Sequence, residues 1–545
     1  MSQALIEALQ NPELYNHKVE SFTLVETHIS WVLLTGPYAY KIKKPVNFGF
    51  LDFSELEQRH HFCQEEVRLN QRLAPDLYLG VLPISGTPER PLLDDNSQPI
   101  EYAVRMKQFP ADQQLEQLLA RQELNFEHMT QIATVVADFH RRVDSSGSDS
   151  PFGTPELAMA PVLQNFEQIK PLLTEPSDRT DLEHIELWAR DTFERLHPVF
   201  EKRKQSGMIR ECHGDLHLGN ITLIDGQVTL FDCIEFNEDF RWIDTISEIA
   251  FFAMDLEDRG LANFASHFVN DYLEQTGDYS GLQLLNFYKS HRALVRAKIA
   301  LFRLQQEGQD SPEAATILGQ YRGYIRLAQS YMNIPNCYLL LMHGYSGTGK
   351  TTVSNELVNE LGLIRLRSDV ERKRFFSRQD NRSQLPDGNI YSHQASELTF
   401  SHIADTALEI LNVGYSLVID ATFLQKLYRD IFVALAEQQG VPVQIIHCQL
   451  DDALVRERIG QRANAGQDAS DADLSIYEMQ LSEAQPLDAQ EAEYSLTVDC
   501  SSAEKISAFV QTLKPAVLIL PPNDGHPVKR VNYATEVNYD KTIRN

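Results

Sequence analysis

The strongest local pattern in the chain is Gly344-Tyr345-Ser346-Gly347-Thr348-Gly349-Lys350-Thr351, which fits G-x-x-x-x-G-K-[ST], the Walker A motif. The apolar run 338–342 before it predicts a buried strand, and residues 352–361 predict a helix. Glycines at this spacing let backbone N–H groups curl round phosphates, and the helix N-terminus adds its positive end. We therefore expect residues 344–352, Thr352 included, to bind a nucleotide. Lys350 would reach its β- and γ-phosphates, and the Thr351 hydroxyl would ligate Mg²⁺.

Two later segments place carboxylates near this loop. Residues 417–420 are an apolar strand that ends at Asp420, the Walker B layout, in which the carboxylate holds Mg²⁺ or its waters. Residues 364–367 predict another short strand, followed closely by Asp369. Because ligands bind beyond the carboxyl ends of strands in open α/β sheets, Asp369 could accept a proton from a substrate hydroxyl. The alternative is that Asp369 caps a helix beginning at the next residue.

A helix expected beyond residue 451 carries three arginines, Arg456, Arg458 and Arg462, and is followed by a loop at 463–473. Arg458 and Arg462 share one face of that helix and could close over the nucleotide phosphates as a lid. The alternative is surface ion pairing with the acidic residues nearby, Asp451, Asp452 or Glu457.

This C-terminal half resembles the small P-loop kinases related to gluconate kinase, adenylylsulfate kinase and polynucleotide 5′-kinase. The resemblance rests on residues 344–351, Ser368-Asp369 and Asp420, and covers roughly residues 337–520. It implies transfer of the γ-phosphate of ATP to a small-molecule or end hydroxyl, and it leaves the acceptor open.

A second motif, in the N-terminal half, reads His213-Gly214-Asp215-Leu216-His217-Leu218-Gly219-Asn220. Protein kinases use a catalytic-loop aspartate, with an asparagine five positions on, to orient the acceptor hydroxyl and bind metal. Asp215 and Asn220 have that spacing. The apolar runs on either side of Asp225-Gly226 predict a hairpin, which brings Asp232 beside Asn220. Two metal ligands therefore converge with the catalytic base Asp215.

A strand expected near residue 40 carries the candidate phosphate lysine of this half. Strand alternation puts Ala39 and Lys41 on one face, as in the kinase Ala-x-Lys arrangement, so Lys41 would hold the α- and β-phosphates. Its expected partner is Glu66 on the following helix, with Glu65 as the alternative. Lys43 shares the face of Lys41 and is an alternative phosphate ligand.

Residues 19–331 resemble the aminoglycoside and choline phosphotransferase family, on the motif His213-Gly214-Asp215 and on Ala137-Asp138-Phe139-His140. The resemblance implies a bilobal fold, Mg-ATP, and phosphorylation of a hydroxyl on a small molecule. Two departures bear on the phosphate and metal sites. The loop Thr27-His28-Ile29-Ser30 has no glycine, and Asp232-Cys233-Ile234 stands where protein kinases have Asp-Phe-Gly.

Composition limits the partners and the compartment. A formal net charge of -28 argues against a chain that coats nucleic acid or anionic membrane. Six cysteines without metal-ligand spacing fit a reduced cytosolic protein, and no apolar run approaches a membrane span of ~18 residues. We expect a cytoplasmic protein without membrane contact. Arg292, Arg296 and Arg303 share one helix face, which could bind an anionic substrate, dock the second domain, or form an ion-paired surface.

The predicted fold class is α+β and α/β, a bilobal protein-kinase-like domain followed by a P-loop NTPase domain with a parallel sheet. We expect the first domain at residues 1–332 (N-lobe 1–109, C-lobe 110–332), the second at 337–520, and a polar tail at 521–545. The leading hypothesis is a bifunctional ATP- and Mg²⁺-dependent phosphotransferase acting on small hydroxyl compounds. A nucleotide-driven switch or ATPase and a polynucleotide end kinase are the alternatives. The sequence leaves the acceptor and the oligomeric state open.

Overall fold

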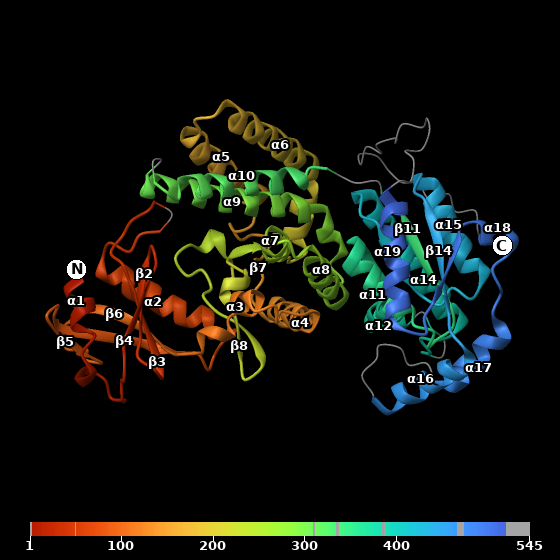
Figure 1. Ribbon diagram of the computed structural model, residues 1–545, viewed down its shortest axis with the longest axis horizontal. Coiled ribbons are helices and arrows are strands. Elements are labelled where there is room, and N and C mark those ends of the chain that lie inside the picture. The colour runs from red at the N-terminus through yellow and green to blue at the C-terminus, as the bar shows by residue number, and fades with distance from the viewer. Residues whose placement is uncertain are drawn as a thin grey trace. The chain divides into compact units, whose positions relative to one another are not determined.

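The computed structural model describes residues 3–49, 51–308, 311–333, 337–383, 385, 388–465 and 473–518, and the side chains of 462–465 and 514–518 are outside this description. The chain divides into two compact units, Met1–Ile334 with Leu361–Ile364, and Pro335–Glu360 with Arg365–Asn545 (Figure 1). The expected tail at 521–545 lies outside the described residues. Among those that are described, no helix has the length and apolar character to cross a membrane.

The first unit begins with an N-lobe built on a six-stranded antiparallel sheet of order β1-β2-β3-β6-β4-β5. One helix precedes the sheet and another follows its third strand. The bounds are α1 Gln3–Ala8, β1 Thr23–Glu26, β2 Ser30–Leu34, β3 Tyr38–Lys43, α2 Leu56–Asn70, β4 Tyr78–Thr87, β5 Arg90–Leu93 and β6 Pro99–Lys107. The first strand begins at Thr23, and residues 19–22 form no strand pairing.

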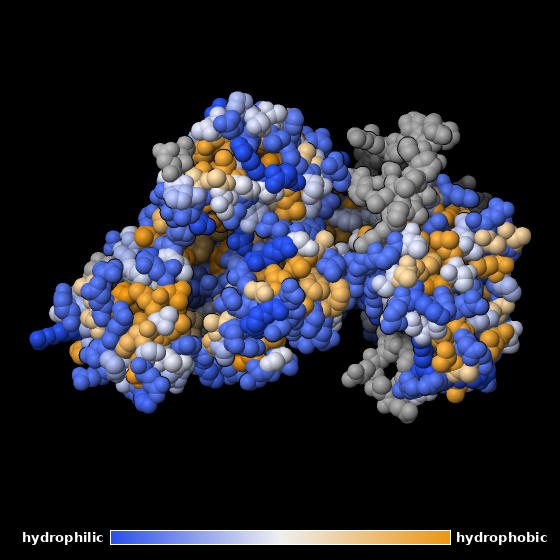
Figure 2. All heavy atoms as spheres, in the orientation of Figure 1, coloured by the Kyte–Doolittle hydropathy of each residue, from blue (hydrophilic) through white to orange (hydrophobic). Residues whose placement is uncertain are grey.

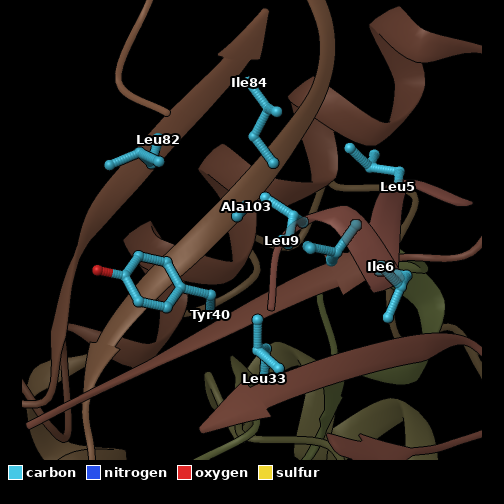
Figure 3. Close-up of a cluster of buried hydrophobic side chains, with 9 residues drawn as sticks. Leu5, Ile6, Leu9, Leu33, Tyr40, Leu82, Ile84 and Ala103 are labelled. Atoms are coloured by element: carbon cyan, nitrogen blue, oxygen red, sulfur yellow. The ribbon is translucent and has the colours of Figure 1, made fainter. Parts of the chain in front are cut away.

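The N-lobe sheet is covered on both faces. Leu5, Ile6 and Leu9 of α1 pack against side chains such as Tyr40, as Figure 3 shows. The cluster on the other face joins Cys63 of α2 to Val104 of β6 and its neighbours. Side chains of β3 alternate between the faces, so Tyr40 and Ile42 meet α1 while the lysines on either side of Ile42 point the opposite way. This alternation places both lysines on the face that α2 covers.

The C-lobe is mainly helical and carries two small antiparallel sheets, β10-β7 and β8-β9. Its bounds are α3 Leu115–Ala120, α4 Phe126–Arg142, α5 Pro155–Ile169, α6 Pro176–Gln205, β7 Ile209–Glu211, β8 Ile221–Ile224, β9 Gln227–Leu230, β10 Trp242–Asp244, α7 Thr245–Asp258, α8 Ala262–Thr276, α9 Leu282–Glu307 and α10 Ala314–Ser330. α7 is buried along most of its length and lies directly behind the catalytic-loop motif. The β8–β9 pair is the expected hairpin.

The second unit is built on a five-stranded sheet of order β12-β13-β11-β14-β15, with β11 at its centre pairing parallel to β13 and β14. The bounds are β11 Leu339–His343, α11 Lys350–Leu361, β12 Ile364–Arg367, α12 Ser368–Ser377, α13 Gln379–Arg382, α14 His393–Val413, β13 Leu417–Asp420, α15 Lys426–Gln439, β14 Val443–Gln449, α16 Asp452–Ala465, α17 Leu474–Glu483, α18 Ala489–Glu493, β15 Ser495–Asp499 and α19 Ala503–Leu518. The antiparallel N-lobe sheet and this parallel sheet confirm the predicted fold class.

Candidate active sites

In the first unit, Lys41 is held between two carboxylates. Its Nζ lies 2.8 Å from Glu66 Oε1 and 2.5 Å from Asp232 Oδ1. Although burial opposes a charge here, Asp232 and Glu66 hold the pKa of Lys41 well above its ordinary value. The three residues come from β3, α2 and the segment after β9, so the fold joins both lobes at this lysine. The alternative partner, Glu65, pairs instead with Arg68 at 2.8 Å.

The second lysine of β3, Lys43, belongs to the same network but is more deeply buried. It pairs with Glu66 Oε2 at 2.7 Å and also with Glu235, three residues after Asp232. Burial opposes the ionised form of Glu66, yet Lys41 and Lys43 together lower its pKa to about 2. Sequence reasoning did not identify Glu235. The Lys43 side chain is 1% exposed and that of Lys41 is 11% exposed, so Lys41 is the more accessible phosphate ligand of the two.

The catalytic-loop residues lie together as their spacing predicts. The Asn220 amide donates to the Asp215 backbone carbonyl at 3.0 Å and to its carboxylate at 3.1 Å. The hairpin closes through Phe231 N–H, which donates to Asn220 O at 3.0 Å, and this brings Asp232 next to Asn220. The Asp232 backbone has φ 67°, an uncommon conformation for a non-glycine residue and one that concentrates at functional sites.

Three further side chains support this loop, and the sequence analysis assigned no role to any of them. His217 Nε2 lies 3.4 Å from Asp215 Oδ2. Burial opposes ionisation of Asp215, but the contact with His217 lowers the pKa of the carboxyl below its ordinary value. Behind the loop, Glu248 of α7 accepts a hydrogen bond from Gly214 N–H at 2.7 Å and contacts His140 Nε2 at 2.7 Å. Glu248 has no local sequence pattern that would reveal the contact, and His140 was noted only as part of the family-like segment 137–140.

The glycine-free loop between β1 and β2 is a self-bonded turn. The Thr27 hydroxyl accepts hydrogen bonds from Ser30 N–H at 2.9 Å and from Ile29 N–H at 3.3 Å. The Thr27 carbonyl accepts from Lys44 Nζ at 2.6 Å. The Thr27 hydroxyl is therefore engaged within the turn.

In the second unit, the glycines of the Walker A loop are required by geometry. Gly347 has φ +84°, and a Cβ there would lie 2.9 Å from Ile459 Cγ1. Gly344 has φ +144°, and its Cβ would lie 2.9 Å from both Cys448 O and Thr348 Oγ1. Such positions favour glycine because the αL and neighbouring regions are strained for other residues. Lys350 Nζ donates to Tyr345 O at 2.7 Å, across the loop.

A cavity of about 1000 Å³ lies over this loop. Six of the nine residues 344–352 line it, namely Ser346, Gly347, Gly349, Lys350, Thr351 and Thr352. Gly344, Tyr345 and Thr348 are not among the lining residues, and the Thr348 hydroxyl braces the loop by donating to Tyr345 O at 2.8 Å. The volume is at the upper end of ligand pockets, roughly 300–1,000 Å³, which suits a nucleotide together with a small acceptor.

Both predicted carboxylates of the second unit line the same cavity. Burial, and then the nearby Asp420 carboxylate, raise the pKa of Asp369. Ser354 Oγ donates to Asp420 Oδ2 at 3.2 Å. α12 begins at Ser368 rather than Val370, and its N-cap position is Arg367, without a side-chain cap. Asp369 is therefore not the capping residue of that helix.

The lid arginines differ in their contacts. Arg458 lines the cavity and donates to Cys500 O at 2.9 Å. Arg456 forms an ion pair with Asp452 at 2.9 Å, which is the surface pairing given above as the alternative to a lid. The side chain of Arg462 lies outside the described residues. Sequence reasoning missed Gln480 of α17, whose Oε1 accepts from Ser346 N–H at 2.9 Å.

Comparisons with known proteins match one family model in each of the two units. Residues 53–285 match the model of the phosphotransferase enzyme family, and residues 339–487 match that of the AAA domain. The chain joins a phosphotransferase-family domain to an AAA domain with a P-loop. These two matches identify the protein as an ATP-dependent phosphotransferase, and they do not identify its acceptor.

Whole-chain and structural relatives extend the comparison. An uncharacterized protein of Mycobacterium tuberculosis strain H37Rv is 28% identical over 450 residues, which cover 82% of this chain and 87% of the relative. A choline/ethanolamine kinase family protein from Mesorhizobium loti aligns with 61% of this chain and 95% of its own, at 13% identity and a TM-score of 0.37. A gluconokinase from Sinorhizobium meliloti aligns with 34% of this chain and 97% of its own, at 16% identity and a TM-score of 0.25.

Proposed function

We propose that both domains are active and that the chain is a bifunctional kinase of small hydroxyl compounds. The supporting observation is that each unit gathers one lysine, one candidate acceptor-orienting aspartate and oxygen ligands suited to a divalent cation. In the first unit these are Lys41, Asp215, Asn220 and Asp232, joined by the contacts described above. In the second, Lys350, Thr351, Asp369 and Asp420 line one cavity.

The residues present fit Mg-ATP. Glycine positions where a Cβ would clash form a cradle for phosphates in the second unit. In the first, the Asn220 amide nitrogen is used by Asp215, which leaves its oxygen available beside the Asp232 carboxylate, and oxygen ligands are what Mg²⁺ prefers. When bound, Mg-ATP supplies the γ-phosphoryl group and a cation that neutralises its charge.

The chain's own residues position the acceptor. The hydroxyl oxygen of the acceptor forms a bond to the γ-phosphorus, the bond from that phosphorus to the ADP oxygen breaks, and the hydroxyl proton passes to the aspartate carboxylate of that site. Asp215 accepts the hydroxyl hydrogen bond in the first unit, and Asp369 does so in the second. Lys41 and Lys350 hold the phosphates. Arg458, which lines the second cavity, balances negative charge at that site.

Two guanidinium groups line the second cavity close to Asp369 in sequence. Arg367 and Arg372 flank Asp369 in sequence, and all three line the cavity. Burial lowers the pKa of Arg372 while the Asp369 carboxylate opposes that shift. An acceptor that carries a phosphate or carboxylate would complement these guanidinium groups.

A nucleotide-driven switch is a second candidate for the first unit alone. The observation in its favour is the self-bonded Thr27 turn, which offers no glycine backbone for a phosphate clamp. Such a switch would bind Mg-ATP and change conformation without forming a phosphorylated product.

The proposal is tested with γ-labelled ATP, Mg²⁺ and a small-metabolite extract, using the wild-type chain and the variants Asp215→Ala and Asp369→Ala. We expect labelled metabolites, at least one lost in each variant. Labelled inorganic phosphate alone in every sample would favour a switch or ATPase over a kinase.

A further inference from the structure

Two arginines of α9 lie beside the catalytic loop of the first unit. Arg292 Nη1 lies 3.4 Å from the carbonyl oxygen of Gly214, the residue before Asp215. Arg296 is one helical turn further along α9 and therefore on the same face. Figure 2 shows the surface of this unit hollowed between the N-lobe and the C-lobe helices. The two guanidinium groups are thus close to the place where an acceptor hydroxyl must meet Asp215.

Phe251 of α7 forms a platform for both guanidinium groups. The Arg292 and Arg296 guanidinium carbons lie 4.7 and 5.3 Å from its ring centroid. The His217 ring centroid is 5.9 Å from the same ring, and His217 contacts the Asp215 carboxylate. Stacking on an aromatic ring fixes the orientation of a guanidinium while leaving its N–H edge for another ligand.

Among the described residues Arg292 forms no direct ion pair, and the Asp215 and Glu248 carboxylates act on its charge only from further away. Arg292 contacts the Gly214 carbonyl and the Ser247 hydroxyl, both at 3.4 Å, and its Nε is buried without a hydrogen-bond partner among the described residues. Arg296 reaches Asp255 only at 3.6 Å. Asp255 already accepts hydrogen bonds from Leu218 N–H and from Arg259. A buried guanidinium group without an anion in direct contact is costly, so the arrangement favours an oxyanion ligand.

We propose that Arg292 and Arg296 bind an oxyanion of the acceptor, so that the first unit phosphorylates hydroxyl compounds carrying a phosphate or carboxylate group. This inference rests on the proposed function of the Asp215 site. An anionic acceptor would be repelled by Asp215 and by the ATP phosphates, and two guanidinium groups offset that repulsion. A cationic acceptor would meet two like charges.

The test uses the full chain with Lys350→Ala, which removes the phosphate lysine of the second unit, and measures ADP release with matched acceptors. Glycerol is compared with glycerol 3-phosphate and glycerate, and glucose with glucose 6-phosphate and gluconate. We expect kcat/KM for an anionic member to exceed that for its neutral partner by about 10-fold or more. Comparing glycerol 3-phosphate with glycerate, and glucose 6-phosphate with gluconate, shows whether the site prefers a phosphate or a carboxylate.

Arg292→Gln and Arg296→Gln should each lower the ratio of kcat/KM for the anionic acceptor to kcat/KM for its neutral partner by about 10- to 100-fold, mainly through KM for the anionic acceptor. Arg303→Gln is the matched control, because it removes the same charge from an exposed position of α9 and should have no effect. Equal rates with neutral and anionic acceptors, or no change in Arg292→Gln, would overturn the inference.

A binding measurement separates this inference from the proposed function. Inorganic phosphate is titrated calorimetrically into the same protein saturated with Mg-ADP. We expect phosphate binding that Arg292→Gln weakens about 10-fold and Arg303→Gln leaves unchanged. If phosphate binds in this way but no acceptor is phosphorylated in an Asp215-dependent reaction, the kinase proposal fails and the oxyanion site stands. Phosphate binding unaffected by Arg292→Gln overturns the oxyanion site itself.

Discussion

The side-chain amide of Asn220 donates to the backbone carbonyl and to the carboxylate of Asp215, at 3.0 and 3.1 Å. The Asn220 backbone carbonyl accepts from Phe231 N–H, so the same asparagine also anchors the strand that leads to Asp232. One residue therefore sets the orientation of the proposed base and the spacing of the proposed metal ligands.

Asn220→Ala should lower Asp215-dependent phosphorylation by about 100-fold, because Asp215 loses its donor and the metal loses a ligand. The Mg²⁺ concentration for half-maximal rate should rise at the same time. Steady-state rates over a Mg²⁺ series check both effects. Gln227→Ala, exposed in the same hairpin, is the control and should behave as wild type. An unchanged Mg²⁺ dependence in Asn220→Ala would remove the asparagine from the metal site.

Glu66→Gln should destabilise the first unit by about 3 kcal/mol, because Lys41 and Lys43 lose a fully buried carboxylate that they share. Asp232 and Glu235 remain as partners, so the loss is partial. Urea denaturation measures the free energy of unfolding. Glu65→Gln is the control, since its ion pair with Arg68 is partly exposed and contributes less than about 1 kcal/mol. Equal losses in the two variants would contradict the shared-carboxylate account.

Gly347→Ala should abolish nucleotide binding by the second unit and spare the first. The added Cβ would stand 2.9 Å from Ile459 Cγ1 at a positive φ, so the Walker A loop must shift. Calorimetric titration with a non-hydrolysable ATP analogue checks the number of sites. Gly460→Ala, where a Cβ meets nothing within 4 Å, should retain both sites. Retention of both sites in Gly347→Ala would show that the loop tolerates the side chain.

Asp369→Asn should raise the thermal stability of the second unit at pH 7. Burial and the Asp420 carboxylate raise the pKa of Asp369 above its ordinary value of 3.8, so the native state binds this proton more tightly than the unfolded state. Ionisation therefore costs stability as pH rises through the native pKa, and the asparagine avoids that cost. The difference in unfolding midpoint between Asp369→Asn and the wild-type chain should shrink as pH falls toward 3.8. A difference that stays constant from pH 7 to pH 4 would exclude this origin.

Local patterns were sufficient for the parts of the two sites that lie close together in sequence. The Walker A loop, the strand ending at Asp420 and the β8–β9 hairpin all follow from spacing, periodicity and turn residues. The contact between Lys41 and Glu66 also follows, because strand alternation and one helix position define it.

Contacts between distant segments could not be predicted. Lys43 and Glu235 are 192 residues apart, and no periodicity links them. Glu248 is a glutamate in a nearly fully buried helix, and its bond to Gly214 N–H depends on how α7 packs behind the loop. The start of α12 was predicted two residues late, since Ser368 and Asp369 favour caps as well as first turns.

The central claim is that each domain holds its own nucleotide site. Equilibrium binding of a non-hydrolysable ATP analogue with Mg²⁺ measures this directly in the wild-type chain, Lys41→Met and Lys350→Met. The account predicts two sites per chain in the wild type, one in each single variant and none in the double variant. One site per chain, lost in Lys350→Met and unaffected by Lys41→Met, would contradict it and leave the first unit without a nucleotide.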